Sequence, residues 1–387
     1  MIEMRGRFNS ASIMIDEIDD VTRAQIQGFL DHPAFAGTRI VIMPDCHAGR
    51  GAVIGFTMTL GEYIVPNVIG VDIGCGMLTA RFGAAEMDLP GLDRWIRARI
   101  PSGFAVHSGT GHVGDRELIR DLRESCRMID ADPDRALRAV GSLGGGNHFI
   151  EAGRDSRGRM FITIHSGSRN FGKRVADHFQ ARAHRAAGKS RRPGMSRDIG
   201  MSRDIRMSRD LDFLPVDSPD ARDYFFCLET AQRFARRNRE EMLRRIETFL
   251  RREAEDAFES VHNFIDPMDR IIRKGATPAR RGERVIIPFN MRDGIALCVG
   301  KGNRDFNFSA PHGAGRILSR SQAKRSLSLE DFRREMRGIY TTTAVRETLD
   351  EAPGAYKDMR TILDNIGGTV EVEDFIKPVY NFKAAGD

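Results

Sequence analysis

The sequence of 387 residues lacks long hydrophobic runs and contains only five cysteines. No apolar stretch reaches the ~18 residues of a membrane-spanning helix, and the N-terminus has no apolar signal-peptide core. The cysteines are odd in number and scattered, which argues against a disulfide framework. We therefore expect a cytoplasmic protein without a membrane partner, in which an important cysteine is a ligand or a nucleophile.

Aromatic residues are also scarce, at 7% of the chain, and the net charge is only +6. So few aromatic side chains argue against a surface built on base stacking. The positive surplus is compatible with a polyanionic partner, but many ordinary enzymes carry the same balance. If nucleic acid binds, contacts to phosphate should outweigh contacts to bases.

No linker rich in Pro, Ser and Gly divides the chain, in which strand and helix patterns are mixed. Apolar runs and alternating segments predict strands over residues 39–43, 52–60, 68–73, 77–82, 160–164, 284–288, 294–299 and 369–380. Helical spacing predicts helices within 89–140 and over 219–260. Candidate site residues run from Asp45 to Lys383, so we predict one integrated α+β domain.

Residues 186–212 differ in composition from the rest of the chain. A six-residue unit, MSRDI plus one residue, recurs nearly three times between residues 195 and 210 in an Arg-rich stretch. A tandem repeat this short cannot bury a face of its own, so we favour a solvated, flexible basic insertion. A basic flap over a bound strand is the alternative.

A metal site is indicated by a carboxylate, a thiol and several histidines. Asp72 and Cys75 lie three residues apart in the glycine-punctuated string VDIGCG, and no second cysteine pair completes a zinc-finger site. Four histidines stand at expected element ends beside Gly, Ser or Asn, where ligand groups tend to be presented. They are His148, His165, His262 (closing the long helix) and His312. For any one of them a structural role is the commoner case, but the joint set suits Mn²⁺, Fe²⁺ or Zn²⁺ better than Mg²⁺.

Seven strings carry a family resemblance. They are MPDCHAGRG (43–51), VDIGCG (71–76), GSLGGGNHFIE (141–151), HSGSRNFG (165–172), RKGATPA (273–279), PHGAGR (311–316) and EAPGAYK (351–357). All resemble the RtcB RNA-splicing ligase family, in the family's order and across nearly the whole chain, which is similar to a short bacterial-type member. The resemblance implies one RtcB-like domain over residues 1–387, with a central mixed or antiparallel β core flanked by helices.

The resemblance also implies the cofactors, which are GTP and two manganese ions in one active site. The implied metal ligands are Asp72, Cys75, His148, His165 and His262, with the Cys75 thiolate bridging both ions. A thiolate between two dications loses its proton readily, and its charge offsets their repulsion. The implied guanylylated residue is His312, whose small neighbours leave room for a phosphorus atom to approach the ring.

Further site residues follow from the same resemblance. The implied nucleotide contacts are Asn147 at the phosphate, Glu151, Tyr356 and Lys383 around the guanine, and Asn290, His312, Gly313, Ala314 and Gly315. The implied RNA and phosphate contacts are Arg169, Arg316, Asp45 and His47; for Asp45 and His47 a turn network that only braces the site is the alternative. Two departures stand out: the chain has Pro288-Phe289-Asn290-Met291-Arg292 where many relatives have Pro-Gly-Ser-Met-Gly, and Pro278 where arginine is common.

The implied activity is joining of an RNA 3′-phosphate or 2′,3′-cyclic phosphate to a 5′-hydroxyl, in RNA repair or tRNA splicing, with an archease-like activator as a further partner. One alternative is an enzyme that caps RNA or DNA 3′-phosphates without sealing them. Another is a non-catalytic RNA-end-binding protein, although none of the expected ligands is missing. A dinucleotide-binding fold is disfavoured because Gly144-Gly145-Gly146 lacks the GxGxxG spacing.

Overall fold

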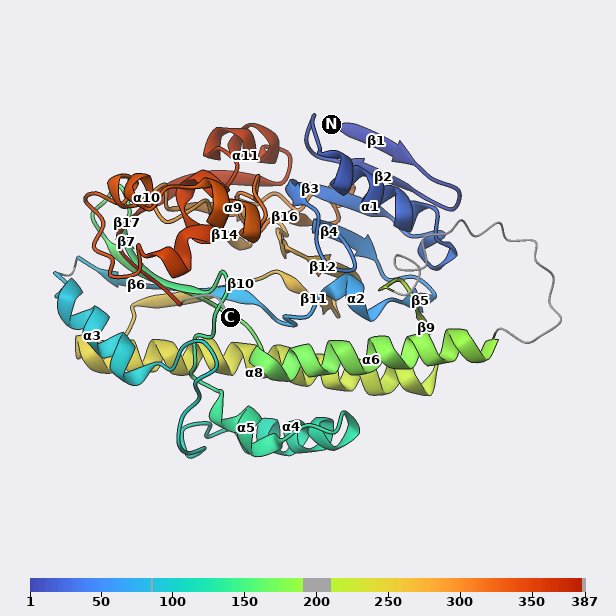
Figure 1. Ribbon diagram of the computed structural model, residues 1–387, viewed down its shortest axis with the longest axis horizontal. Coiled ribbons are helices and arrows are strands. Elements are labelled where there is room, and N and C mark those ends of the chain that lie inside the picture. The colour runs from blue at the N-terminus through green and yellow to red at the C-terminus, as the bar shows by residue number, and fades with distance from the viewer. Residues whose placement is uncertain (85, 191–209, 385–387) are drawn as a thin grey trace.

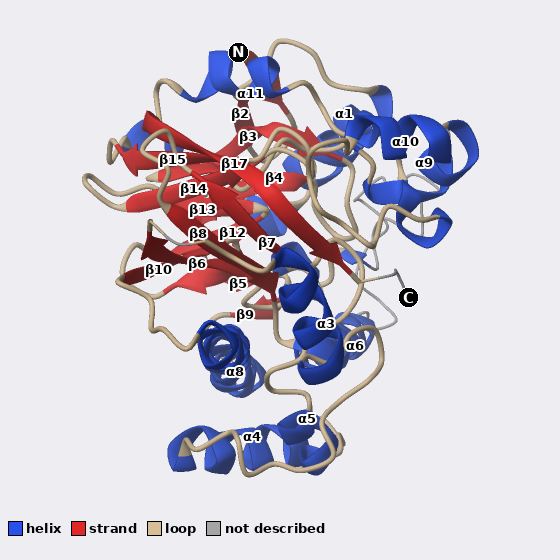
Figure 2. Ribbon diagram, turned by 90° about the vertical axis from the view of Figure 1, so that its left-hand side faces the viewer, coloured by secondary structure: helices blue, strands red, loops and turns tan. Residues whose placement is uncertain are grey.

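The computed structural model describes residues 1–84, 86–190 and 210–384. Its strands form two large sheets in the middle of the molecule, as Figures 1 and 2 show. Helices α6 (Arg169–Ser190) and α8 (Pro219–Leu250) run side by side beneath the strands, and α4 (Arg116–Met128) and α5 (Pro133–Arg138) form a further layer below them. No helix within the described ranges is both long and apolar enough to cross a membrane.

The first sheet has six strands, of which only β2 and β3 pair in parallel. In spatial order its strands are β1 (Ile2–Arg5), β2 (Ser10–Ile13), β3 (Ile40–His47), β4 (Ile54–Thr59), β12 (Ile271–Lys274) and β11 (Asn263–Asp266). The second sheet has seven strands, all antiparallel. Its order is β10 (Asp256–Val261), β6 (Gly76–Gly83), β8 (Met160–Ser166), β7 (Phe149–Arg154), β17 (Val370–Lys383), β15 (Ile295–Gly300) and β14 (Arg284–Pro288).

Short elements complete the fold. The two-stranded pairs are β13 (Ala276–Pro278) with β16 (Ser309–Pro311), and β5 (Tyr63–Ile64) with β9 (Leu214–Pro215). The remaining helices are α1 (Asp20–Leu30), α2 (Pro66–Ile69), α3 (Leu89–Arg99), α9 (Arg320–Ser326), α10 (Leu329–Glu335) and α11 (Met359–Ile366). The predicted α+β class and the mixed or antiparallel core are confirmed.

The long helix α8 begins where the sequence predicts and ends earlier. Ser218 caps its N-terminus by accepting from the Ala221 amide, and Pro219 occupies the first turn. It ends at Arg251, which adopts a left-handed conformation with φ of 49°. The predicted extension to residue 260 is wrong because residues 256–261 form β10, paired with β6. His262 therefore lies between two strands, β10 and β11, instead of closing a helix.

The strand predicted over residues 68–73 is also wrong. Pro66 starts the short helix α2, and Gly70, with φ of 92°, ends it. Val68 and Ile69 are fully buried, and a short apolar run buried on all sides has no periodicity that distinguishes strand from helix. The other predicted strands are present with shifts of a few residues at their ends. Of the predicted basic insertion, residues 191–209 lie outside the described part of the chain.

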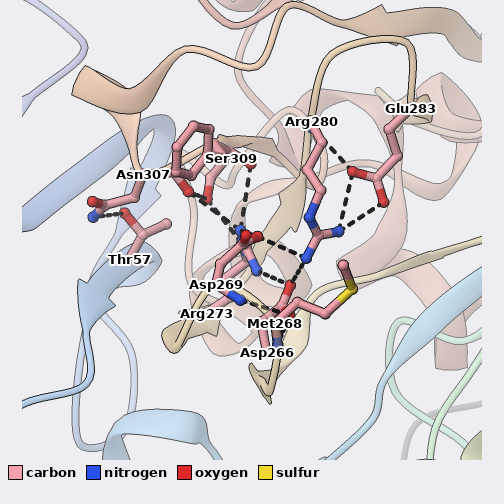
Figure 3. A network of polar contacts seen from close by, with 10 residues as sticks. Thr57, Asp266, Met268, Asp269, Arg273, Arg280, Glu283, Asn307 and Ser309 are labelled. Atoms are coloured by element: carbon pink, nitrogen blue, oxygen red, sulfur yellow. Dashed lines mark hydrogen bonds and ion pairs between the residues drawn. The ribbon is translucent and has the colours of Figure 1, made fainter.

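A buried ion-pair network ties the first sheet to the segment that leads into His312 (Figure 3). Arg273 of β12 is fully buried and donates to Asp266 Oδ2 at 2.8 Å and to Ser309 Oγ of β16 at 2.8 Å. Arg280 also contacts Asp266. The Asn307 carbonyl accepts from Arg273 at 3.2 Å. The network therefore fixes β16, and with it the residue that follows.

Replacing Arg273 with methionine should destabilise the protein by about 3–5 kcal/mol, since it strips a buried carboxylate of its main partner. Urea unfolding would measure this loss. The matched control is Arg252→Met, because Arg252 and Glu255 pair at 2.7 Å but are each more than 40% exposed. That change should cost at most about 1 kcal/mol. Equal losses in the two variants would contradict a stabilising role for the network.

Candidate functional site

The turn that carries Asp72 and Cys75 lies tightly against helix α8. Gly74 has φ of 72°, and a Cβ there would approach Gln232 Cα and Ala235 Cβ to 3.0 Å. The turn therefore requires glycine both for its conformation and for this close approach. From the same helix, Arg239 donates to the Gly74 carbonyl at 2.9 Å and to the Ser166 carbonyl at 2.8 Å. This fully buried guanidinium holds the turn beside the end of β8.

The predicted ligand residues converge in this region. Cys75 Sγ lies 3.2 Å from His165 Nε2 and 3.5 Å from His148 Nε2, and these three residues form a buried cluster that could hold a metal ion. His148 Nε2 is also 2.9 Å from Asp72 Oδ2. His262 Nε2 lies 3.2 Å from His165 Nε2. The five residues come from the turn before β6, the loop before β7, β8 and the β10–β11 junction.

Backbone carbonyls orient two of the imidazole rings. His165 Nδ1 donates to the Asn147 carbonyl at 3.2 Å, which leaves its Nε2 with a lone pair directed at Cys75. His148 Nδ1 lies 2.9 Å from the Leu143 carbonyl oxygen and 2.9 Å from an Arg169 guanidinium nitrogen that donates to it. Burial holds the pKa of His165 and of His262 well below the usual range, so both rings are neutral at pH 7. Neutral imidazole is the form that binds metals.

The donor set fits a divalent transition metal. Sulfur, imidazole nitrogen and a carboxylate oxygen lie 2.9–3.5 Å from one another, a mixed donor set that a divalent transition metal prefers. Asp72 Oδ1 and His262 Nδ1 are buried and have no hydrogen-bond partner among the described residues. Burial, followed by the charge of Asp72, raises the pKa of the Cys75 thiol, which must lose its proton to bind a metal.

His312 lies beside this cluster. It directly follows β16, and its ring centroid is 4.6 Å from that of His262. Its Nδ1 donates to Asp45 Oδ2 at 2.7 Å, which leaves Nε2 with a free lone pair. Asp45 itself is fully buried behind the ring. Gly315, with φ of 73°, is required here because a Cβ would lie 2.1 Å from the Asp45 carbonyl oxygen.

A cavity of about 770 Å³ adjoins the cluster, within the size range of nucleotide-binding pockets. Among the residues that line it are most of the predicted nucleotide and RNA contacts: His47, Asn147, Glu151, Asn290, His312, Gly313, Ala314, Gly315, Arg316, Tyr356 and Lys383. Glu151 accepts from Asn381 through Oε2, whereas its buried Oε1 has no partner among the described residues. Burial raises the pKa of Glu151 to about 8.

Several predicted residues have their polar groups engaged within the protein, among them Asn290, Arg169 and Asp45. The Asn290 amide closes its own turn by donating to Asp293 at 2.7 Å. Arg169, at the start of α6, places its guanidinium against Gly144 and 2.9 Å from the His148 ring. Asp45 does not line the cavity but contacts His312, in agreement with the bracing alternative. Direct contacts of these residues to nucleotide or RNA stay predictions.

Sequence reasoning missed a buried carboxylate behind the cavity wall. Glu351 accepts from Lys383 Nζ at 2.5 Å, from the Tyr356 hydroxyl at 2.5 Å and from Arg316 at 3.2 Å. It is the first residue of the EAPGAYK string, but a single glutamate in a string carries no signal of burial. Asn381 and Arg320, which also line the cavity, stand in segments without any distinguishing pattern.

Comparison with known proteins agrees with this geometry. The profile of the family described as tRNA-splicing ligase RtcB matches residues 25–384. The chain belongs to the RtcB family. It is 30% identical over 372 residues to the RNA-splicing ligase RtcB of Escherichia coli K12, across 87% of this chain and 88% of that protein. The resemblance predicted from the motifs is therefore confirmed.

Other relatives carry the same description. The chain is 29% identical over 405 residues to the RNA-splicing ligase RtcB of Mycobacterium tuberculosis, across 83% of this chain and 91% of that protein. It is 28% identical over 407 residues to the tRNA-splicing ligase RtcB of Aeropyrum pernix, across 82% of both chains. RNA-ligase family membership therefore extends to relatives from both bacteria and archaea.

The candidate metal centre predicts that a divalent transition metal stabilises the protein, and Mn²⁺ is a suitable probe. Mn²⁺ at about 100 times its Kd should add about 2.7 kcal/mol to the stability of the folded protein and raise its Tm. The Cys75→Ala variant should lose this shift because it removes the central sulfur ligand. Cys126→Ala, at another buried cysteine in α4, is the control and should keep the shift. Differential scanning calorimetry with and without Mn²⁺ checks this, and an unchanged shift in Cys75→Ala would refute the site.

Proposed function

We propose that this protein is a GTP- and manganese-dependent RNA ligase that joins a 3′-phosphate or 2′,3′-cyclic phosphate end to a 5′-hydroxyl end through a guanylylated His312. The observation that carries the proposal is the unpaired Nε2 of His312. It belongs to a ring held by Asp45, lines the cavity and lies beside the ligand cluster. Family membership supports the same conclusion.

The first step is transfer of GMP to the protein. His312 Nε2 attacks the α-phosphorus of GTP, a nitrogen–phosphorus bond forms, and pyrophosphate leaves with the electrons of the broken bond. Asp45 accepts from Nδ1 throughout, so it keeps the reactive tautomer and stabilises the positive charge that develops on the ring. Manganese in the cluster would supply positive charge beside the phosphorus atoms under attack.

The next steps take place on RNA. A 2′,3′-cyclic phosphate is first opened by water to the 3′-phosphate. An oxygen of the RNA 3′-phosphate attacks the phosphorus on His312, which releases the imidazole and forms an activated anhydride. The 5′-hydroxyl then attacks the RNA phosphorus and gives up its proton to solvent, the new phosphodiester forms, and GMP leaves. Arg316 and Arg320 line the cavity, and in this proposal they bind phosphate oxygens, for which Arg316 exchanges part of its contacts with Glu351 and Asp350. Splitting one difficult displacement in this way replaces a poor leaving group with a better one.

The substrate class follows from this chemistry. RNA with 3′-phosphate or cyclic phosphate ends arises both in tRNA splicing and from nuclease damage, and we propose either as the source. We also propose that the protein forms a single domain over residues 1–387, acts in the cytoplasm and is assisted by an archease-like activator.

His312→Ala should reduce formation of the covalent GMP adduct by at least ~10³-fold, because no other group would carry the reacting nitrogen. Incubation with radiolabelled GTP and Mn²⁺, followed by a denaturing gel, measures the adduct. His184→Ala is the control, since His184 lies half-exposed on α6 and pairs with Asp212. If the His312→Ala variant still formed the covalent GMP adduct, His312 would not be the nucleophile. The alternative, a capping enzyme, is tested by mixing a labelled 3′-phosphate strand with a 5′-hydroxyl strand. A capping enzyme would add only GMP to the labelled strand, whereas a ligase would join the two strands.

Binding of GMP without metal should strengthen with pH. Glu151 has a pKa of about 8 in the free protein, so its carboxyl is mostly protonated at pH 6.5 and mostly ionised at pH 8.5. Only the ionised form can accept from both guanine N1–H and the exocyclic amine, so the affinity should rise about tenfold over this interval. Isothermal titration calorimetry measures it. Glu151→Gln should bind GMP weakly with a flat pH profile, and a slope equal to that of the wild type would show that another group titrates.

A further inference from the structure

Glu351 joins four side chains of the cavity wall without lining the cavity itself. It ends the 3-10 turn of residues 346–351 and is fully buried. One oxygen, Oε2, accepts from Lys383 Nζ and from the Tyr356 hydroxyl, each at 2.5 Å. The other, Oε1, lies 3.2 Å from Arg316 and 3.6 Å from Arg320. A buried carboxylate with this many partners determines where each of them points.

The strand register places Lys383 near a second carboxylate. In the pairing of β7 with β17, Asn381 is opposite Glu151 and Lys383 is opposite Phe149. Lys383 is therefore a diagonal neighbour of Glu151 on the same face, at a spacing that long side chains can bridge. Its ammonium lies 5.3 Å from the Phe149 ring centroid. Without Glu351, the nearest buried anion for this ammonium would be Glu151.

We propose that Glu351 is a positioning residue that determines base specificity, because it holds Lys383 away from Glu151 and so leaves the Glu151 carboxylate free to accept hydrogen bonds from a purine. The inference rests on the proposed function, which requires a nucleotide in this cavity. A carboxylate recognises two adjacent N–H donors, which guanine offers through N1–H and its 2-amino group and adenine does not. Were Lys383 paired with Glu151, its ammonium would occupy the acceptor oxygen that the purine needs.

The structure supports this division between the two carboxylates. Glu351 has three cations within 4 Å. Glu151 has one amide donor, from Asn381, and keeps Oε1 buried without a partner among the described residues. Leaving a buried carboxylate oxygen unpaired is costly unless a ligand satisfies it. Glu351 also fixes the Tyr356 ring, over which the Arg316 guanidinium lies at 5.1 Å from the centroid.

The test is Glu351→Gln, which keeps the shape of the side chain and removes its charge. Lys383 should then turn to Glu151, and the preference for GMP over AMP, measured by calorimetry without metal, should fall by about tenfold or more. The control is Glu241→Gln. Glu241 is another fully buried carboxylate, paired with Arg237, Arg244 and Arg245 of α8, none of which lines the cavity. It should lose stability while keeping the wild-type base preference.

A double variant distinguishes an effect that acts through Lys383 from a general loss of structure. In a Lys383→Met background no ammonium remains to be released, so adding Glu351→Gln should leave the ratio of GMP to AMP affinity unchanged. An equal fall of that ratio in both backgrounds would overturn the inference, as would a Glu351→Gln variant with wild-type preference. Wild-type protein that binds no guanine nucleotide would instead refute the proposed function itself.

Discussion

The buried guanidinium of Arg239 is the interaction on which the candidate metal centre depends. It reaches from α8 to the carbonyls of Gly74 and Ser166, and its remaining donors meet Glu259 of β10 at 2.8 Å. It therefore joins the turn that carries Cys75, the end of β8 that carries His165, and the strand that leads to His262. A planar group with five donors in a fixed geometry can do this, whereas a lysine could not. The surrounding carbonyls and Glu259 satisfy its charge, so its burial is tolerated.

A second buried arginine serves the nucleophile in the same way. Arg273 donates to Ser309 and to the Asn307 carbonyl and so fixes β16. His312 directly follows β16 and lines the cavity. The ligand cluster and His312 thus belong to different supporting networks, one built on α8 and the second sheet and the other on the first sheet. They meet where the His262 and His312 rings lie 4.6 Å apart. These two buried networks therefore determine how the Cys75 turn and the His165 end of β8 lie relative to His312.

The sequence predicts the site better than it predicts the elements that carry it. Asp72, Cys75, His148, His165 and His312 stand in distinctive strings, so they could be identified before their positions were known, whereas His262 was identified only from its place at an expected element end. The end of α8 could not, because residues 256–261 alternate too weakly to reveal that β10 pairs with β6. Val68 and Ile69 are buried on every side, which removes the periodicity that separates helix from strand. Glu351 could not be identified for another reason: its three cationic partners, Arg316, Arg320 and Lys383, lie 30 or more residues away in the sequence.

The two buried glutamates of the cavity show how environment assigns different roles to one residue type. Both carboxylates are buried, yet only Glu351 forms ion pairs among the described residues, and its pKa is lowered while burial raises that of Glu151. A fold optimised for stability alone would share Lys383 between them. Because Lys383 pairs with Glu351, the Oε1 atom of Glu151 has no hydrogen-bond partner among the described residues. Such an unsatisfied polar atom costs stability in the free protein, and it is retained most readily where a ligand repays the cost on binding.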